Sequence, residues 1–185
     1  YKRQGGSVYS AFTFAGIEGR LSGKTAGGRT MSERQGGCSC KATRYTLTEE
    51  PMFTHVCHCS ICKRHTGTAF VTHIFIESAY LEVTEGRVEA YAGQTGSGSE
   101  HWVYRCPDCL SALYSHYAGN DQIALVKGGT LDDPASLPPG AHLWVENKVP
   151  WIEIPDGVPA FDQNYVAADV WPAASMERRR KAGWG

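Results

Sequence analysis

The sequence predicts a mainly β domain, and three observations lead to that prediction. From about residue 36 onward, short β-branched and aromatic stretches recur, separated by glycine-containing turns. Helical periodicity is weak throughout the same region. Seven cysteines lie in three short clusters, a pattern typical of a fold held together by metal. At 185 residues, the chain is long enough for one domain with a substantial core.

The predicted strands follow one another closely along the chain. Residues 42–47 alternate, with Tyr45 and Leu47 on one face and Thr46 on the other. Residues 70–76 form the strongest β-branched and aromatic stretch. The further predicted strands cover residues 81–83, 88–91, 101–104, 112–117 and 122–127. This close spacing of short strands is typical of an all-β architecture.

Helical signals are confined to short segments. A helix is predicted to begin after Cys59 and to end at Gly67, and residues 131–137 allow a single further turn. Residues 137–159 contain five prolines, so we expect an ordered connection with short strands. Its large apolar side chains are expected to pack inward: Trp144, Val145, Trp151 and Ile152.

The two ends of the chain differ from the region between them. Residues 1–30 are basic and rich in Gly, Ser and Thr, so we expect a non-native or disordered extension, with a transit peptide as the alternative. The folded domain is predicted to cover residues 31–165, beginning at Met31. Residues 166–185 form a basic C-terminal segment, of which residues 176–185 are expected to be a solvated, frayed tail.

Charge and hydropathy exclude several classes of protein. The net charge of −1 gives no strong basic field, so nucleic acid is not an expected partner. No apolar run approaches the roughly 18 residues that a membrane span needs. Clustered free thiols persist in a reducing compartment, which predicts a cytoplasmic location.

The seven cysteines are the strongest functional signal. The three clusters are Cys38 with Cys40, Cys57 with Cys59 and Cys62, and Cys106 with Cys109. Cysteines two or three positions apart can direct both sulfurs at one zinc ion, at roughly 2.3 Å. An odd number cannot be consumed by internal disulfides, and the compact run typical of an iron–sulfur cluster is absent. Zinc is therefore the expected metal.

The clusters divide into two centres. A closed structural zinc takes four ligands, whereas a catalytic zinc takes three and keeps one position open. The two pairs can complete a structural site: Cys38, Cys40, Cys106 and Cys109. The remaining three cysteines can surround a second, open zinc and are the candidate catalytic residues: Cys57, Cys59 and Cys62. A zinc with three thiolates is suited to binding a further thiol.

Residues near the clusters allow more than one interpretation. His58 lies between two candidate ligands and is expected to face away from the metal, although it could supply a fourth ligand. The cations after Cys62 either form a solvated helix face or attract an anion: Lys63, Arg64 and His65. The histidines of the predicted strands are expected to be surface or core residues: His73, His101 and His116.

The order of the clusters, together with residues 57–70 and 127–134, resembles the glutathione-dependent formaldehyde-activating enzyme family, which also includes centromere protein V. The resemblance covers about residues 36–161. It implies a tent-like, Mss4-like fold of antiparallel sheets pinned by zinc, with the same division of ligands. One departure is Leu110, which stands where the family usually has glycine. Leucine adopts a left-handed turn poorly, so this turn is expected to be built differently.

The resemblance also implies an activity, the condensation of formaldehyde with glutathione to S-hydroxymethylglutathione. The sequence therefore predicts a zinc-dependent enzyme of the carbon–sulfur lyase type, with glutathione as its small-molecule thiol partner. The alternatives are a non-enzymatic zinc-stabilised binding module and a thiol redox sensor or zinc buffer. The sequence gives no indication of the oligomeric state.

Overall fold

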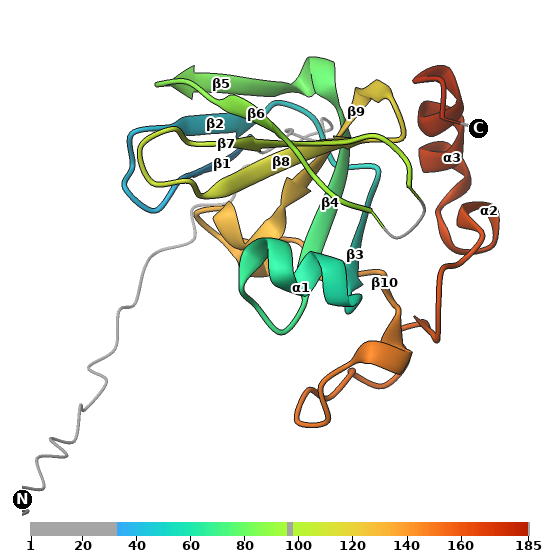
Figure 1. Cartoon of the computed structure of the whole chain (residues 1–185). Coiled ribbons are helices and arrows are strands. Elements are labelled where there is room, and N and C mark those ends of the chain that lie inside the picture. The colour runs from blue at the N-terminus through green and yellow to red at the C-terminus, as the bar shows by residue number, and fades with distance from the viewer. Residues whose placement is uncertain (1–32, 96–97, 185) are drawn as a thin grey trace, which may run out of the picture. The chain divides into compact units, whose positions relative to one another are not determined.

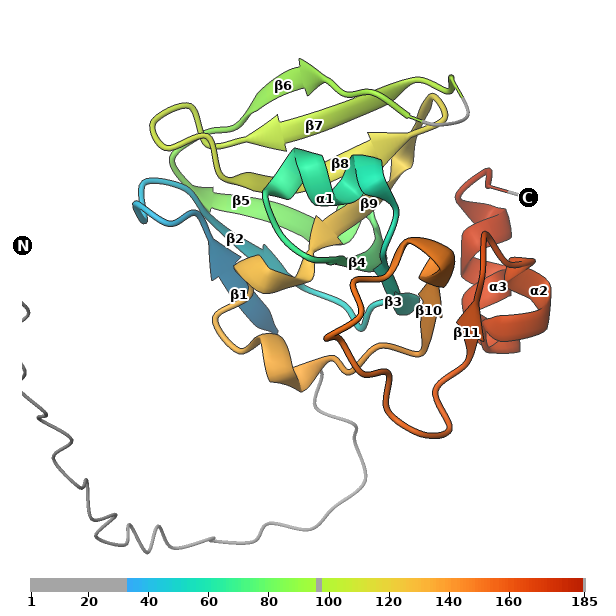
Figure 2. The ribbon, with the colours of Figure 1, turned by 60° about the horizontal axis from the view of Figure 1, so that its bottom comes forward.

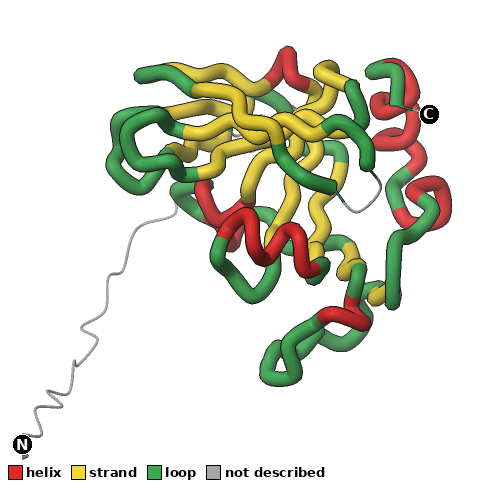
Figure 3. The backbone as a smooth tube through the Cα atoms, viewed as in Figure 1, coloured by secondary structure: helices red, strands yellow, loops and turns green. Residues whose placement is uncertain are grey.

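The computed structural model describes residues 33–95 and 98–184. Within these residues, eleven strands form a three-stranded and an eight-stranded sheet, and α-helix is limited to three short segments (Figure 3). The predicted mainly β fold is confirmed. No helix in this part of the chain is long and apolar enough to cross a membrane. The extension expected at residues 1–30 lies outside the described residues.

The two sheets differ in pairing. The small sheet is antiparallel, in the order β1 (Arg34–Gly37), β2 (Arg44–Leu47) and β5 (Leu81–Glu85). The large sheet has the order β11 (Ala160–Phe161), β10 (Ala141–Leu143), β3 (Phe53–Cys57), β4 (Val71–Glu77), β9 (Asn120–Lys127), β8 (Ala112–Tyr117), β7 (His101–Arg105) and β6 (Glu89–Ala92). It is antiparallel except at one edge, where β10 pairs in parallel with β3 and with β11.

Strand β4 is buried on both faces and separates two apolar clusters. Ile74 and Ile76 face the small sheet and join the main core with Tyr45. Phe75 points to the opposite face, as the alternation of a strand requires, and packs there against Trp171. Burial of each isoleucine contributes about 1.5–3 kcal/mol. The second face of the large sheet is therefore covered by the C-terminal part of the chain.

Helix α1 (Ser60–Thr66) follows β3 directly and agrees with the predicted helix. The Cys59 sulfur caps its N-terminus by accepting the Cys62 N–H, and Gly67 ends it in a left-handed conformation with φ of 69°. Single 3₁₀ turns connect other elements: η1 (Ser78–Tyr80), η2 (Gly128–Thr130), η3 (Pro134–Ser136) and η4 (Val145–Asn147).

The proline-rich connection packs less tightly than the sequence predicts. Trp151 is 71% exposed, so its expected inward packing is wrong. Its segment forms a local turn, in which Ile152 N–H donates to Val149 O and Lys148 Nζ donates to Ile152 O. Because these hydrogen bonds are made within the loop, the turn does not need to bury its tryptophan against the sheets.

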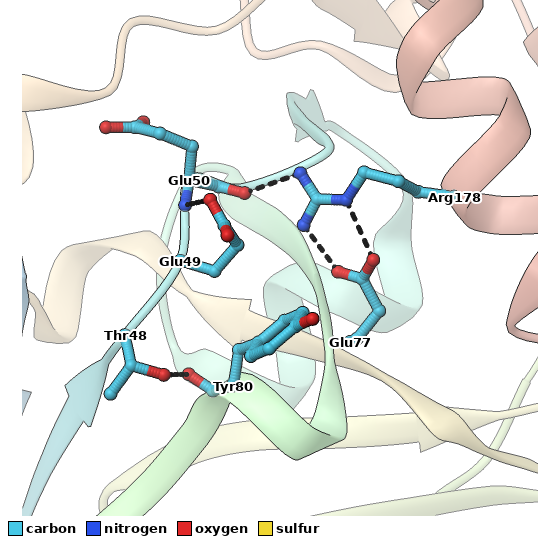
Figure 4. Close-up of polar contacts among 6 residues, drawn as sticks. All are labelled: Thr48, Glu49, Glu50, Glu77, Tyr80 and Arg178. Carbon is cyan, nitrogen blue, oxygen red and sulfur yellow. Dashed lines mark hydrogen bonds and ion pairs between the residues drawn. The ribbon is translucent and has the colours of Figure 1, made fainter. Parts of the chain in front are cut away.

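The expected frayed tail is instead folded, as α2 (Ala167–Val170) and α3 (Ala173–Lys181) (Figures 1 and 2). The Arg178 guanidinium donates from Nε and Nη2 to the two carboxylate oxygens of Glu77, at 2.8 and 2.6 Å, and from Nη1 to the Glu50 carbonyl at 2.8 Å (Figure 4). Trp184 packs near Phe75, with ring centroids 6.0 Å apart. A bidentate, half-buried ion pair and aromatic packing thus order a segment that composition alone predicts to be solvated.

Candidate functional site

Four cysteine sulfurs meet where two turns of the chain approach each other. Cys38 and Cys40 lie between β1 and β2, and Cys106 and Cys109 lie between β7 and β8. Their sulfurs are all within 4.8 Å of one another, and we call them the four-sulfur group. None of the seven cysteines forms a disulfide. Four thiols at one point are the donor set of a closed zinc site, so these residues fit that metal.

The two turns that carry this group are built alike. In the first cysteine turn (residues 38–43), Cys38 N–H donates to Thr43 O at 3.0 Å, and in the second (residues 106–111), Cys106 N–H donates to Ser111 O at 3.1 Å. Left-handed residues follow both cysteine pairs: Lys41 with φ of 67° and Leu110 with φ of 60°. The expectation that Leu110 changes this turn is wrong, because leucine takes the left-handed conformation at a cost of about 1–2 kcal/mol.

Hydroxyl groups around the four-sulfur group favour thiolates, the form that binds metal. A hydrogen bond from Thr43 lowers the pKa of Cys106. Hydrogen bonds from Ser111 and Ser39 lower the pKa of Cys109 to about 5. The second cysteine turn therefore favours the charged form of both of its sulfurs.

A three-sulfur group forms at the junction of β3 and α1. Cys57 ends the strand, Cys59 caps the helix and Cys62 lies in its first turn, with all three sulfurs within 4.8 Å of one another. Hydrogen bonds from Cys57 and Cys62 lower the pKa of Cys59 to about 2. Three thiols and no further ligand fit the donor set of a zinc site with an open position.

His58 lies apart from the sulfurs. Its ring is fully buried, with Nε2 3.0 Å from Nδ1 of His142 on β10. In the described part of the chain, the metal-capable group at this place contains Cys57, Cys59 and Cys62 and no histidine nitrogen. The geometry thus gives no support to His58 as a fourth ligand.

A cavity of about 590 Å³ adjoins the three-sulfur group. This volume falls in the range of roughly 300–1,000 Å³ typical of sites for small organic ligands. Polar residues of its lining come from the large sheet and α1: His55, His65, His73, His101, Ser115 and Lys127. Aromatic and cationic residues come from the C-terminal segment: Tyr165, Trp171, Arg179 and Trp184. Of the described cysteines, only the three-sulfur group lines this cavity.

A row of polar side chains crosses the sheet beneath the cavity. The register places His55 opposite His73, and His73 opposite Lys127. Lys127 Nζ donates to Ser115 Oγ at 2.9 Å and lies 3.4 Å from His73 Nδ1. Lysine has only donors, so His73 Nδ1 accepts and its Nε2 carries the proton, 3.5 Å from Cys62 Sγ. The chain Ser115, Lys127, His73 and Cys62 is therefore connected by hydrogen bonds.

Burial sets the charges in this row. It lowers the pKa of Lys127 to about 8, so the ammonium is still largely charged at pH 7. Burial, and then the charge of Lys127, hold the pKa of His73 well below its usual value, which keeps the ring neutral. Lys127 has no carboxylate partner among the described residues, and the acidic groups that favour its charged form are the thiols of Cys62 and Cys57. A buried cation therefore stands beside the sulfurs.

The C-terminal segment is tied to the same row. Trp171 Nε1–H donates to the Tyr165 hydroxyl at 3.0 Å, and that hydroxyl lies 2.7 Å from His55 Nδ1. Because the tryptophan N–H can only donate, the tyrosine oxygen accepts from it, and the same hydroxyl forms a second hydrogen bond with His55 Nδ1. This links the cavity wall to the sheet.

Several cavity residues were not recognised in the sequence. From the sequence, His73 and His101 are expected only to be surface or core residues, and Lys127 has no assigned role. Their place in the cavity depends on strand register, which the sequence does not give. Trp171 and Trp184 fall in the expected basic C-terminal segment. Two tryptophans in this short basic segment are a signal of packing, since tryptophan is largely buried on average.

Comparison with known proteins now gives the family. The family model described as "Glutathione-dependent formaldehyde-activating enzyme" matches residues 33–147, more than half of the chain. The chain belongs to this family. The matched part contains all seven cysteines and Lys127, and it ends before the C-terminal segment that lines the cavity.

Two individual proteins are similar to this member of the family. A protein of Halomonas elongata, provisionally named a glutathione-dependent formaldehyde-activating enzyme, is 25% identical over 131 residues, which cover 65% of this chain and 80% of the relative. A crystal structure of a Rhodobacter sphaeroides protein matches 69% of this chain and 98% of its own, with 17% identity and a TM-score of 0.39.

Proposed function

We propose that this protein is a zinc-dependent enzyme of the carbon–sulfur lyase type that joins a small thiol to formaldehyde. The observation that carries the proposal is the three-sulfur group in the wall of a cavity large enough for a peptide-sized thiol. Family membership supports glutathione as the thiol and S-hydroxymethylglutathione as the product. We further propose a second, structural zinc at the four-sulfur group.

The chemistry is an addition without oxidation or reduction. Cys57, Cys59 and Cys62 would hold the zinc ion, which would supply a site for binding a further thiol as a thiolate. The substrate sulfur forms a bond to the carbonyl carbon, and the π electrons of the C=O bond move to oxygen. The proton lost from the thiol is balanced by the proton that this oxygen takes up.

Two buried side chains assist this addition. Lys127 places a positive charge beside three thiolates, which offsets the negative charge that an incoming thiolate adds. His73 directs its Nε2–H at the sulfur of Cys62 and so fixes the orientation of that ligand. The aromatic wall of the cavity limits the access of water, which strengthens both effects.

The proposed functional unit extends beyond residue 165, because Trp171, Arg179 and Trp184 contribute to the cavity. We propose a cytoplasmic location, since reduced cysteine clusters suit a reducing compartment. The basic C-terminal residues do not favour a nucleic-acid-binding module. Arg178 is paired with Glu77, and the next cations pair with Glu177: Arg180 and Lys181.

The test is a rate comparison at low glutathione, because uncatalysed addition of thiols to formaldehyde is fast. Wild type containing zinc should form the adduct faster than buffer, and Cys57→Ser should give the buffer rate while keeping its circular dichroism spectrum. Elemental analysis should find two zinc ions per wild-type chain and one in the variant. Wild type that holds two zinc ions and gives only the buffer rate contradicts the proposal.

A further inference from the structure

The segment after the family-matched region contributes one wall of the cavity. This C-terminal wall consists of Asn164, Tyr165, Ala167, Trp171, Arg179 and Trp184. Figures 1 and 2 show α2 and α3, which carry Ala167 and Arg179 of this wall, together at one side of the large sheet. The family model ends at residue 147, so this wall is absent from the region by which the family is defined. Its side chains are therefore candidates for selecting the substrate of this protein.

Arg179 differs from the cations around it. Arg178 forms a bidentate pair with Glu77 (Figure 4), whereas Arg180 and Lys181 both pair with Glu177. The Arg179 side chain has no ion-pair or hydrogen-bond partner among residues 33–95 and 98–184, and Arg179 is the member of this basic run that lines the cavity. Three of four consecutive cations are thus paired with carboxylates of the protein itself, and the fourth is left for a ligand.

Two tryptophans hold the Arg179 side chain. Its Cζ lies 5.5 Å from the ring centroid of Trp171 and 5.2 Å from that of Trp184. Cation–π contacts of this kind stabilise the positive charge of the side chain. The N–H donors of a guanidinium lie in its plane and remain able to form two parallel hydrogen bonds with a carboxylate.

The remainder of the cavity is also suited to an anion. Its described lining contains Lys127 and Arg179 and no aspartate or glutamate. Burial lowers the pKa of His101 to about 4, so this lining histidine is neutral at pH 7. Lys127 is hydrogen-bonded to His73 beside the sulfurs, whereas Arg179 stands on α3 among the tryptophans. The two cations therefore mark two different places for negative charge.

We propose that Arg179 binds a carboxylate of the thiol substrate and makes the C-terminal wall the part of the site that determines specificity. The inference rests on the proposed function for the place of the substrate sulfur, beside the three-sulfur group. The substrate class is then a thiol with a carboxylate remote from its sulfur, which includes cysteine-containing peptides such as glutathione. A thiol without a carboxylate fills the sulfur position and leaves Arg179 unpaired.

The experiment measures binding without turnover. S-methylglutathione, whose sulfur is blocked, and its dimethyl ester, whose carboxylates are neutral, are titrated into the zinc-containing protein by calorimetry. A hydrogen bond to a charged group contributes about 1.5–3 kcal/mol, so wild type should bind the acid about 10- to 100-fold more tightly than the ester. Arg179→Gln should weaken binding of the acid by a similar factor and leave binding of the ester nearly unchanged.

The controls separate recognition from folding and from catalysis. Arg180→Gln, on the exposed side of the same helix, should bind the acid as wild type does. If Arg179→Gln does not fold, Arg179→Lys keeps the charge and should give intermediate affinity, because lysine offers no planar pair of donors. Wild type that binds neither probe or does not distinguish them, or an Arg179 variant with wild-type affinity, overturns the inference. Arg179-dependent binding without faster adduct formation contradicts only the proposed reaction.

Discussion

The two sulfur groups use the same ligand atom in opposite surroundings. The four-sulfur group joins cysteines 66 residues apart, Cys40 and Cys106, whose sulfurs lie 3.8 Å from each other. Cys38 and Cys106 of this group belong to the main core. The three-sulfur group is gathered from six consecutive residues and faces a cavity. A metal in the first place connects distant parts of the fold, whereas in the second place it adds little to connectivity and is open to ligands.

The polar neighbours of the two groups differ in the same sense. Around the four-sulfur group they are hydroxyls, such as that of Ser111, which bonds the Cys109 sulfur at 3.2 Å. Around the three-sulfur group they include the neutral ring of His73 and the buried cation of Lys127. Neutral donors are sufficient for a closed site. A buried cation is of use where further negative charge is expected to arrive.

The largest expected effect comes from breaking the four-sulfur group with Cys106→Ser. Structural zinc has an apparent binding free energy of about 10–16 kcal/mol, which is comparable to the about 5–15 kcal/mol stability of a whole domain. The variant should therefore lose most of its β circular dichroism signal at 25 °C. The matched variant Cys57→Ser removes one sulfur of the other group and should keep that signal.

The opposite result would remove the distinction between the two groups. If Cys106→Ser remains folded with a melting temperature within a few degrees of wild type, the four-sulfur group is not the structural centre. If Cys57→Ser unfolds as well, both groups hold the fold together, and the open site has a structural role that its location in a cavity wall does not indicate.

The second expectation concerns the release of metal to a chelator. Zinc bound by the three-sulfur group is reachable through the cavity, so the native protein should release one equivalent to 4-(2-pyridylazo)resorcinol before it unfolds. The second equivalent should appear only together with the loss of β signal, because the four ligands join distant parts of the fold. Cys38 and Cys106 belong to the main core, while Cys40 is exposed. Simultaneous release of both equivalents contradicts this order. The absorbance of the chelator complex, followed alongside circular dichroism, distinguishes stepwise from simultaneous release.

Sequence reasoning reached the features that depend on local spacing. The assignment of the cysteines to two groups follows from positions along the chain, and so does α1, since Cys59 and Gly67 are end signals for a helix. The strands with strong β-branched runs were predicted for the same reason. Strand β3 was missed. Its Phe53–Cys57 segment lies close to a proline and has no clear alternation of apolar and polar residues, so the sequence does not distinguish it from a loop.

Features that depend on register or on long-range pairing could not be predicted in this way. The row of His55, His73 and Lys127 exists only because β3, β4 and β9 are adjacent at one register. The fold of the C-terminal helices depends on Arg178 and Glu77, which are 101 residues apart. A single sequence shows which residues are near each other along the chain. It does not show which distant residues meet in the fold.

The third expectation tests the electrostatic difference between the two sulfur groups with the variant Lys127→Met. Burial lowers the pKa of Lys127 from 10.5 to about 8, so between these values the unfolded chain binds a proton that the folded chain has released. Stability therefore rises with pH from about 8 to 10.5 in wild type, and below about 8 the full penalty for burying the charge is present. The Lys127→Met variant has no such penalty, so its unfolding free energy should exceed that of wild type at pH 7. This difference should shrink by about 2 kcal/mol from pH 7 to pH 10.

Urea denaturation at several pH values measures this difference. Lys181→Met, which replaces a lysine that is exposed on α3, is the matched control for the loss of a lysine. If Lys127→Met behaves like Lys181→Met, then Lys127 is solvated in solution and does not act as a buried cation beside the sulfurs.

The smallest expected effect tests the second cysteine turn directly, with Leu110→Gly. Leu110 is left-handed and 54% exposed, so little burial is lost when its side chain is removed. Relief of about 1–2 kcal/mol of left-handed strain exceeds the about 0.5–1 kcal/mol entropic cost of glycine, which leaves a net gain of about 0.5–1 kcal/mol. The melting temperature should rise by about 1–3 °C. Leu110→Ala keeps the Cβ atom and should show no gain, and an equal rise in both variants would mean that backbone strain is not what Leu110 contributes to this turn.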